Sequence, residues 1–197
     1  MTGFDGRLRR RGALQRLLAE RAFDCVGIAA YTTNMRHVVS AARAVRRLQP
    51  GSKLVVGGPH ASLGPDDPAA ATGADHVVMG DGEEPLLAIL RGALDGPGIH
   101  TPGRGPGGPG SIHVHDRLAE LDFPDRSVFP VSRYYRSHLR GRGRWTAMIT
   151  SRGCHMPCAH CSAPRLSAGA HRTRSHDAIL EELDALRADH GVDGVYL

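Results

Sequence analysis

The sequence predicts an α/β protein built on parallel strands. Three short apolar runs have the composition of buried strands and alternate with segments of helical period: Cys25–Tyr31, Lys53–Gly58 and His76–Gly80. The stretches between these runs are long enough to hold helices, so we expect the strands to lie parallel with right-handed connections. A chain of 197 residues, 41% of them hydrophobic, can also bury a core and has room for one domain or two small ones.

The expected helices of the first half space their apolar residues about 3.6 positions apart. In chain order these segments are Gly12–Ala22, Met35–Leu48, a short helix within Pro59–Ala74, and Glu84–Leu94. Thr33 or Asn34 can cap the second of them, and Pro50 with Gly51 stops it.

The second half predicts a linker followed by the opening of another α/β domain. Gly96–Gly110 is too rich in glycine and proline to pack, which predicts a linker or a loose hairpin, and the proline-punctuated segment after it is expected to be irregular. Arg144–Gly153 predicts a strand, Ser175 caps a helix that Gly191 ends, and a further strand follows. We therefore expect three parts, at residues 1–95, 96–143 and 144–197.

Charge and hydropathy exclude two classes of partner. No apolar run is long enough to span a bilayer, and the N-terminus lacks the apolar core and cleavage site of a signal peptide, so we expect a cytoplasmic protein with no membrane partner. The net charge of +5 includes one tight run of Arg7, Arg9, Arg10 and Arg11. Because no aromatic residues interleave with these arginines, they indicate a solvated helix end and no nucleic-acid site.

Three of the four cysteines, Cys154, Cys158 and Cys161, lie close together with the spacing C-x3-C-x2-C. In a reducing cytoplasm such clustering indicates a metal or catalysis and argues against disulfides. Three thiolates suit a 4Fe-4S cluster that leaves one iron open to a small molecule, whereas structural zinc requires four closed ligands. A Cys3His zinc site remains an alternative, although zinc motifs usually come as two separated pairs. The histidines that could complete it are His155, His160 and His171.

This cysteine motif after a strand, in the context ITSRGCHMPCAHCSAP, resembles the radical SAM superfamily. The downstream RTRSHDAILEELDALRADHGVDGVYL resembles the first helix and second strand of its partial (β/α) barrel. The resemblance implies that the three cysteines hold a 4Fe-4S cluster whose open iron binds S-adenosylmethionine. An electron from the cluster would cleave the sulfonium to methionine and a 5′-deoxyadenosyl radical, which abstracts hydrogen from substrate. The residue before the third cysteine is usually aromatic and lies beside the adenine, a place that His160 takes here.

The first half resembles the cobalamin-binding domain that precedes the barrel in one branch of that superfamily. The segments that carry the likeness are VGIAAYTT, KLVVGGPHAS and GADHVVMGDGEEPLLAIL, and LDFPDRSVFPVSRYY resembles the connector of that branch. The likeness implies a Rossmann-like doubly wound parallel sheet whose strand-end loops line the cofactor crevice. The implied cobalamin contacts are Tyr31, Thr32, Thr33, Gly57, Gly58, His60 and Gly80. Each has a plainer alternative, since strand-end glycines are often turns and the histidine can cap the next segment.

Two departures from the pattern bear on cobalamin. The D-x-H-x-x-G motif that supplies a lower axial histidine to cobalt is absent, and we expect the first strand and helix of the domain to be missing before Met1. Many members of the branch lack that histidine. The remaining cysteine, Cys25, begins an apolar strand and is expected to be a small core residue. Asp81, Glu83 and Glu84 are explained by the favourable dipole at the start of a helix.

The combined interpretation is a cobalamin-binding-domain radical SAM protein that methylates an unactivated carbon or phosphorus, or drives a radical rearrangement or cyclisation. Its partners would be a small-molecule substrate and an electron donor such as flavodoxin or ferredoxin. The alternative is a truncated, catalytically inactive binding module that holds a cluster or a Cys3His zinc, because residues 144–197 supply only the opening βαβ of a barrel that needs about 200 residues or more. A methylthiotransferase-like enzyme is disfavoured, since it would need further cysteines besides Cys25.

Overall fold

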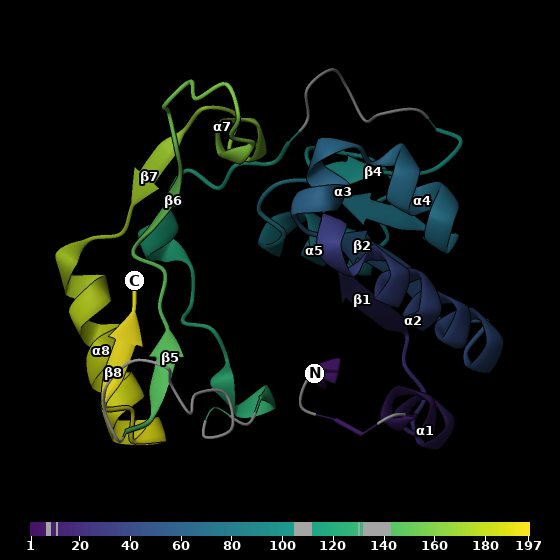
Figure 1. Cartoon of the computed structure of the whole chain (residues 1–197), viewed down its shortest axis with the longest axis horizontal. Helices are drawn as coiled ribbons and strands as arrows, with labels where there is room; N and C mark the ends of the chain where they lie inside the picture. The colour runs from purple at the N-terminus through teal and green to yellow at the C-terminus, as the bar shows by residue number, and fades with distance from the viewer. Residues whose placement is uncertain (7–8, 11, 105–111, 130, 132–142) are drawn as a thin grey trace. The chain divides into compact units, whose positions relative to one another are not determined.

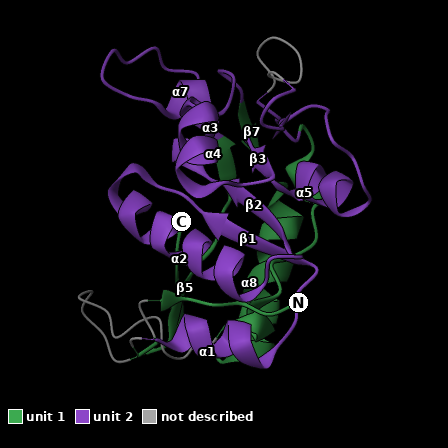
Figure 2. Cartoon of the chain, turned by 90° about the vertical axis from the view of Figure 1, so that its right-hand side faces the viewer, with its two compact units in different colours: residues 1–11, 116–152, 171–197 green, residues 12–115, 153–170 purple. Residues whose placement is uncertain are grey.

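The computed structural model describes residues 1–6, 9–10, 12–104, 112–129, 131 and 143–197, and the chain forms two compact units (Figure 2). The larger unit comprises Gly12–His115 and Gly153–Ala170. The smaller unit comprises Met1–Arg11, Asp116–Arg152 and His171–Leu197. The arginine run lies partly outside the described residues, at positions 7 and 11. Among the described residues, no helix has the length and apolar character to cross a bilayer.

The larger unit is built on a four-stranded sheet in the order β1-β2-β3-β4. The first three strands are β1 (Cys25–Ala29), β2 (Lys53–Gly57) and β3 (His76–Val78), and they run parallel. The fourth, β4 (Ile99–His100), is antiparallel to β3. The parallel α/β sheet expected from the apolar runs is confirmed, and its described strands follow one another in chain order.

Helices cover both faces of this sheet (Figure 1). On one face lie α1 (Ala13–Glu20), α2 (Met35–Leu48), α3 (Pro59–Leu63) and α4 (Asp66–Thr72). On the other lies α5 (Glu83–Leu90). Successive side chains of β2 point to opposite faces of the sheet and so contribute to both cores. Leu54 and Val56 pack with α1–α4, while Val55 packs against Ile89 of α5. The result is the layered arrangement of a Rossmann-like domain.

The glycine- and proline-rich segment is part of the larger unit, where the sequence predicted a linker from residue 96. Ile99 and His100 are each 2% exposed and pair with β3, and His113 forms an isolated bridge with Gly80. Gly98, with φ of +74°, lets the chain pass Met79 closely, since a Cβ there would lie 2.9 Å from the Met79 carbonyl oxygen. Residues 105–111 lie outside the described part of the chain. The compact unit therefore continues to residue 115.

The smaller unit contains the expected βαβ element. Its strands β5 (Trp145–Ala147) and β8 (Gly194–Tyr196) pair in parallel, joined through α8 (His176–His190). Ser175 caps α8 by accepting a hydrogen bond from the Ala178 amide, and Gly191 ends it with φ of +57°. Within the described residues of this unit, Met148, Leu186 and Val192 form a buried apolar cluster. The predicted strand, helix and strand are thus confirmed, with Ser175 and Gly191 at the expected ends of the helix.

The prediction of one continuous strand over residues 144–153 is wrong, because the structure has two separate strands there. After β5 the chain leaves the sheet at Met148–Thr150, and β6 (Ser151–Gly153) pairs with β7 (His171–Thr173). The sequence did not predict β7, because its residues are polar and carry no apolar run. The β6–β7 pair joins the two ends of the segment that contains the three cysteines.

Short 3-10 turns occupy the segment before β5, which the sequence predicted to be irregular. They are η3 (Leu118–Glu120) and η4 (Arg126–Val128). Residues 130 and 132–142 lie outside the described part of the chain. Asp125 caps η4 by accepting from Ser127, and these hydrogen bonds lower the pKa of its carboxyl group.

Candidate functional site

The cysteine loop, Gly153–Ala170, closes through a glycine that no other residue could replace without strain. Gly153 has φ of +88°, and a Cβ on it would lie 1.9 Å from the Ala170 carbonyl oxygen. Ser167, 5% exposed, braces the loop from within: its hydroxyl donates to the Ala163 carbonyl at 3.1 Å and accepts from the Cys154 amide at 3.3 Å. The loop is therefore a folded element with its own internal hydrogen bonds.

The three thiols of this loop are free and accessible. Cys158 and Cys161 are exposed and Cys154 is half-buried. The chain turns tightly between them, because the Cys161 amide donates to the Cys158 carbonyl at 3.1 Å. A short helix, α7 (Ala163–Leu166), follows at once, and the Ala163 amide points at the Cys161 sulfur from 3.4 Å. Hydrogen bonds from backbone amides to the sulfurs are a common feature of iron–sulfur sites.

The spread of these donors can be compared with the geometry of a closed zinc site. A tetrahedral zinc with Zn–S bonds of about 2.3 Å holds its sulfurs about 3.8 Å apart. In the described part of the chain, no three ligand atoms from the cysteines and the loop histidines, His155 and His160, all lie within 4.8 Å of one another. The donors of this structure are therefore not gathered as in a closed zinc site, and the loop offers three thiols to either a 4Fe-4S cluster or a Cys3His zinc. His160 itself is exposed, between the second and third cysteines.

The cysteine loop lies at the carboxyl end of the sheet in the larger unit. Its helix α7 packs against α3, the helix that directly follows β2, and both belong to the same compact unit (Figure 2). In a parallel sheet, ligands bind outside the carboxyl ends of the strands. The structure thus brings the predicted cluster ligands beside the predicted cobalamin edge, a juxtaposition that sequence spacing does not reveal.

Side chains after β1 and β2 meet at this edge. The hydroxyl of Thr32 lies 3.0 Å from His60 Nδ1, and His60 Nε2 lies 3.1 Å from Asp67 Oδ2. Tyr31, 52% exposed, donates its backbone amide to the Asn34 side chain at 2.8 Å. Thr32 and Thr33 are also exposed, so this edge offers hydroxyl and aromatic groups to a ligand.

The glycines at this edge differ in how much room a side chain would have. Gly58, with φ of +103°, would place a Cβ 2.8 Å from the Ala30 carbonyl oxygen, and Gly80, with φ of +86°, would place one 2.1 Å from that of His113. A Cβ on Gly57 would make only ordinary contact with Val78, at 3.5 Å. The close approaches at Gly58 and Gly80 are thus to the protein's own backbone, which gives both a structural role beside any contact with cofactor.

Comparison with known proteins is consistent with this geometry. Residues 9–90 match the B12 binding domain. Over 93% of its length the chain also matches the structure of the radical S-adenosylmethionine methyltransferase TsrM from Kitasatospora setae, with a TM-score of 0.66, 20% identity and 38% of that chain covered. A second TsrM structure, with cobalamin and a [4Fe-4S] cluster bound, gives a TM-score of 0.64 at 21% identity and covers 92% of this chain and 38% of that one. At these identities the likeness shows a shared fold: a Rossmann-like B12-binding fold in the larger unit.

Two curated relatives are methyltransferases by name. One is an uncharacterized methyltransferase of Pyrococcus horikoshii, 25% identical over 86% of this chain. The other is the 2-(S-pantetheinyl)-carbapenam-3-carboxylate methyltransferase of Streptantibioticus cattleyicolor, 29% identical over 88% of this chain. The chain spans 38% and 27% of the lengths of these two relatives.

Cys25 is half-buried and packs against the core of the B12-binding fold. It packs with Val55 and Ile89, and burial is the main cause that raises the pKa of its thiol, against a smaller opposing effect of Lys53. A raised pKa keeps the thiol protonated, which is the inert form. On the same sheet, burial first and then Lys53 lower the pKa of His76.

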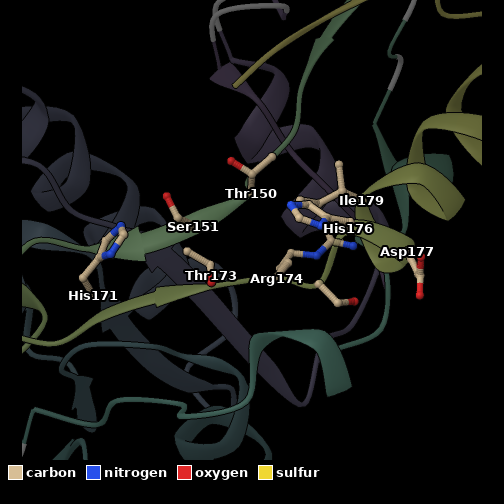
Figure 3. Close-up of a pocket in the computed structure, with 9 residues that line it drawn as sticks. Thr150, Ser151, His171, Thr173, Arg174, His176, Asp177 and Ile179 are labelled. Atoms are coloured by element: carbon tan, nitrogen blue, oxygen red, sulfur yellow. The ribbon is translucent and has the colours of Figure 1, made fainter.

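A polar hollow of about 640 Å³ lies in the smaller unit, beside the N-terminus of α8 (Figure 3). Its lining combines hydroxyl groups of β6, β7 and the helix cap with two imidazoles, His171 and His176. Arg174 also lines it, but its guanidinium pairs with Glu182 and donates to the Ala178 carbonyl at 2.9 Å. Sequence reasoning missed this hollow, because it depends on the pairing of β6 with β7.

Proposed function

We propose that this chain binds cobalamin at the carboxyl ends of β1–β3 and a 4Fe-4S cluster on Cys154, Cys158 and Cys161, within a radical SAM methyltransferase. The observation that carries the proposal is the packing of α7 on α3, which sets the cysteine loop beside the sheet edge of a B12-binding fold in one compact unit. Methyl transfer through two such cofactors requires their sites to be neighbours, and the packing of α7 on α3 supports this arrangement.

In this proposal the loop residues bind and orient the cluster. The three thiols provide its ligands, Gly153 and Ser167 hold the loop closed, and the Ala163 amide donates a hydrogen bond to the Cys161 sulfur. With one iron left open, the bound cluster would supply an electron and a binding position for S-adenosylmethionine. In this proposal the exposed ring of His160 lies against the adenine.

In this proposal the sheet edge holds cobalamin, but His60 does not bind to the cobalt. Both nitrogens of its ring already have partners, Thr32 on one side and Asp67 on the other, so ligation would require breaking one of these contacts. His60 and the exposed Tyr31, Thr32 and Thr33 therefore act as walls of the binding edge. This agrees with the absence of the D-x-H-x-x-G motif from the sequence.

Methylation is favoured over rearrangement by the names of the two curated relatives, both methyltransferases. The substrate in this proposal is a small molecule, and the electron donor is a flavodoxin or ferredoxin. We place the protein in the cytoplasm, because all four cysteines are free. The second candidate is a binding module that holds a cluster or a Cys3His zinc but completes no reaction.

Anaerobic reconstitution with iron, sulfide and hydroxocobalamin, followed by desalting, tests the proposal. We expect about one cluster and one cobalamin retained per chain. Cys158→Ala should lose iron and keep cobalamin, while Gly58→Leu should lose cobalamin and keep iron; Cys25→Ala should keep both. Zinc that withstands competition by iron would contradict the cluster, and no retained cobalamin would contradict the B12 site. Production of methionine and 5′-deoxyadenosine, or of S-adenosylhomocysteine, separates an enzyme from a binding module.

A further inference from the structure

Two histidines and a carboxylate gather at the carboxyl end of β3, where His113 forms a bridge with Gly80, one of the predicted cobalamin contacts. Glu84 Oε2 lies 2.9 Å from His113 Nε2, and Glu84 Oε1 lies 3.0 Å from His115 Nδ1. One ligand atom from each of the three residues lies within 4.8 Å of the other two. The two imidazoles are 15% and 14% exposed, and Glu84 is 56% exposed.

The backbone fixes this arrangement before any ligand binds. Around His113 the chain is tied to the end of β3: its amide donates to the Met79 carbonyl at 3.0 Å, and its carbonyl accepts from the Asp81 amide at 2.8 Å. The His115 amide donates to Asp81 Oδ2 at 2.9 Å. In an extended segment residues two apart face the same side, so both imidazoles point toward the first turn of α5, where Glu84 lies.

The geometry at His113 is that of a metal ligand more than of a hydrogen-bond donor. Its Nε2 atom is fully buried and makes no aligned hydrogen bond within the described part of the chain, although Glu84 Oε2 is only 2.9 Å away. Ligands bound to one ion at about 2.1 Å, at angles between a right angle and a tetrahedral one, lie about 3.0 to 3.4 Å apart. The two nitrogen–oxygen separations, 2.9 and 3.0 Å, lie just below this range and at its short end.

We propose that Glu84, His113 and His115 form a binding site for a divalent transition-metal ion of the zinc type. Two imidazoles and one carboxylate suit such an ion, whereas magnesium and calcium prefer oxygen ligands alone. Three protein ligands with an exposed carboxylate leave a coordination position open to water or a small anion. The ion fastens residues 112–115 to β3 and α5, and so ties the last strand-like segment of the larger unit to its sheet.

Equilibrium dialysis of the full chain against zinc, followed by metal analysis, tests this site. The cysteines would also bind zinc, so the parent protein is the Cys154→Ala, Cys158→Ala, Cys161→Ala triple variant. We expect about one zinc per chain in the parent. In Glu84→Gln and His115→Ala, made in that background, the affinity should fall by more than about 100-fold, because loss of an outer-sphere partner alone already costs about 10- to 100-fold.

Matched controls and a second readout keep the result independent of misfolding. Glu181→Gln and His37→Ala change exposed residues of the same types and should bind zinc as the parent does. Zinc should raise the thermal midpoint of the parent and of both controls, and leave that of Glu84→Gln unchanged. No zinc in the parent, or parental affinity in Glu84→Gln, would show that the histidines only form ion pairs with Glu84 and would overturn the site.

Discussion

Replacing Glu182 by glutamine should strongly destabilise the smaller unit. The Glu182 side chain is 2% exposed and lies between two arginines: its Oε1 is 2.6 Å from Arg126, and its Oε2 pairs with Arg174. The two guanidinium groups are themselves only 12% and 9% exposed. Glutamine keeps the shape of the side chain and removes its charge, so two buried cations lose their counterion.

The magnitude follows from what the arginines retain. Removing one partner of a buried ion pair costs about 3–5 kcal/mol. Arg126 still donates to the Ala147 carbonyl at 3.1 Å, and Arg174 to those of Ile149 and Ala178 at 3.1 and 2.9 Å. These carbonyls still accept hydrogen bonds from the two buried guanidinium groups after the charge of Glu182 is lost. We therefore expect the free energy of unfolding to fall by an amount at the low end of this range, about 3 kcal/mol.

The single tryptophan makes the assay specific to this unit. Trp145 lies on β5, with its ring centroid 5.7 Å from that of Tyr196, so its fluorescence reports unfolding of the smaller unit. Urea titrations should give a clearly lower midpoint for Glu182→Gln than for the wild type, with an unchanged slope. Glu181→Gln, an exposed neighbour on the same helix, is the control. Equal midpoints for the two variants would refute the ion-pair reasoning.

Three further predictions concern the loop, the second sheet and pH. Gly153→Ala should cut the iron retained on reconstitution to less than about half with all cysteines present, because its Cβ would meet the Ala170 carbonyl at 1.9 Å, whereas Gly64→Ala, in open space, should not. Gly194→Ala should lower the free energy of unfolding by about 1–3 kcal/mol, since its Cβ would lie 2.7 Å from the Trp145 ring; an unchanged urea midpoint would contradict the β5–β8 packing. Burial lowers the pKa of His76, so the folded chain takes up its proton at lower pH than the unfolded chain, and stability should fall as pH drops below about 6.5. The thermal midpoint should change less with pH, between neutral and mildly acidic values, in His76→Asn than in the wild type. The same pH dependence in both proteins would exclude His76 as its cause.

The sequence predicts elements that carry their own local signal. The apolar runs beginning at Cys25, Lys53 and His76 each became a strand starting at that residue, and Ser175 and Gly191 bound α8 as capping chemistry requires. What the sequence could not supply depends on contacts between distant residues. β4 is two residues within a glycine- and proline-rich segment, and it forms only because β3 offers an open edge.

The candidate site divides in the same way. The spacing of Cys154, Cys158 and Cys161 is local, so the motif could be recognised without the fold. The packing of α7 on α3 joins residues about a hundred positions apart, and no periodicity encodes it. Glu84 and His115 are also far apart in the sequence, so their contact could not be predicted from it. The sequence explained Glu84 only as a favourable charge at the start of a helix. A His-x-His pair in an extended segment was the one local signal that could have been noticed.

The neighbourhood of the two cofactor sites is the central claim, and electron paramagnetic resonance tests it most directly. The chain would be loaded with cobalamin and reconstituted with iron and sulfide, and the relaxation of the cob(II)alamin signal would be measured with the cluster reduced and oxidised. The account predicts faster relaxation when the cluster is reduced, and no such change in Cys158→Ala loaded with cobalamin alone. If both cofactors are bound and reduction of the cluster leaves the relaxation of the cob(II)alamin signal unchanged, the claim is contradicted.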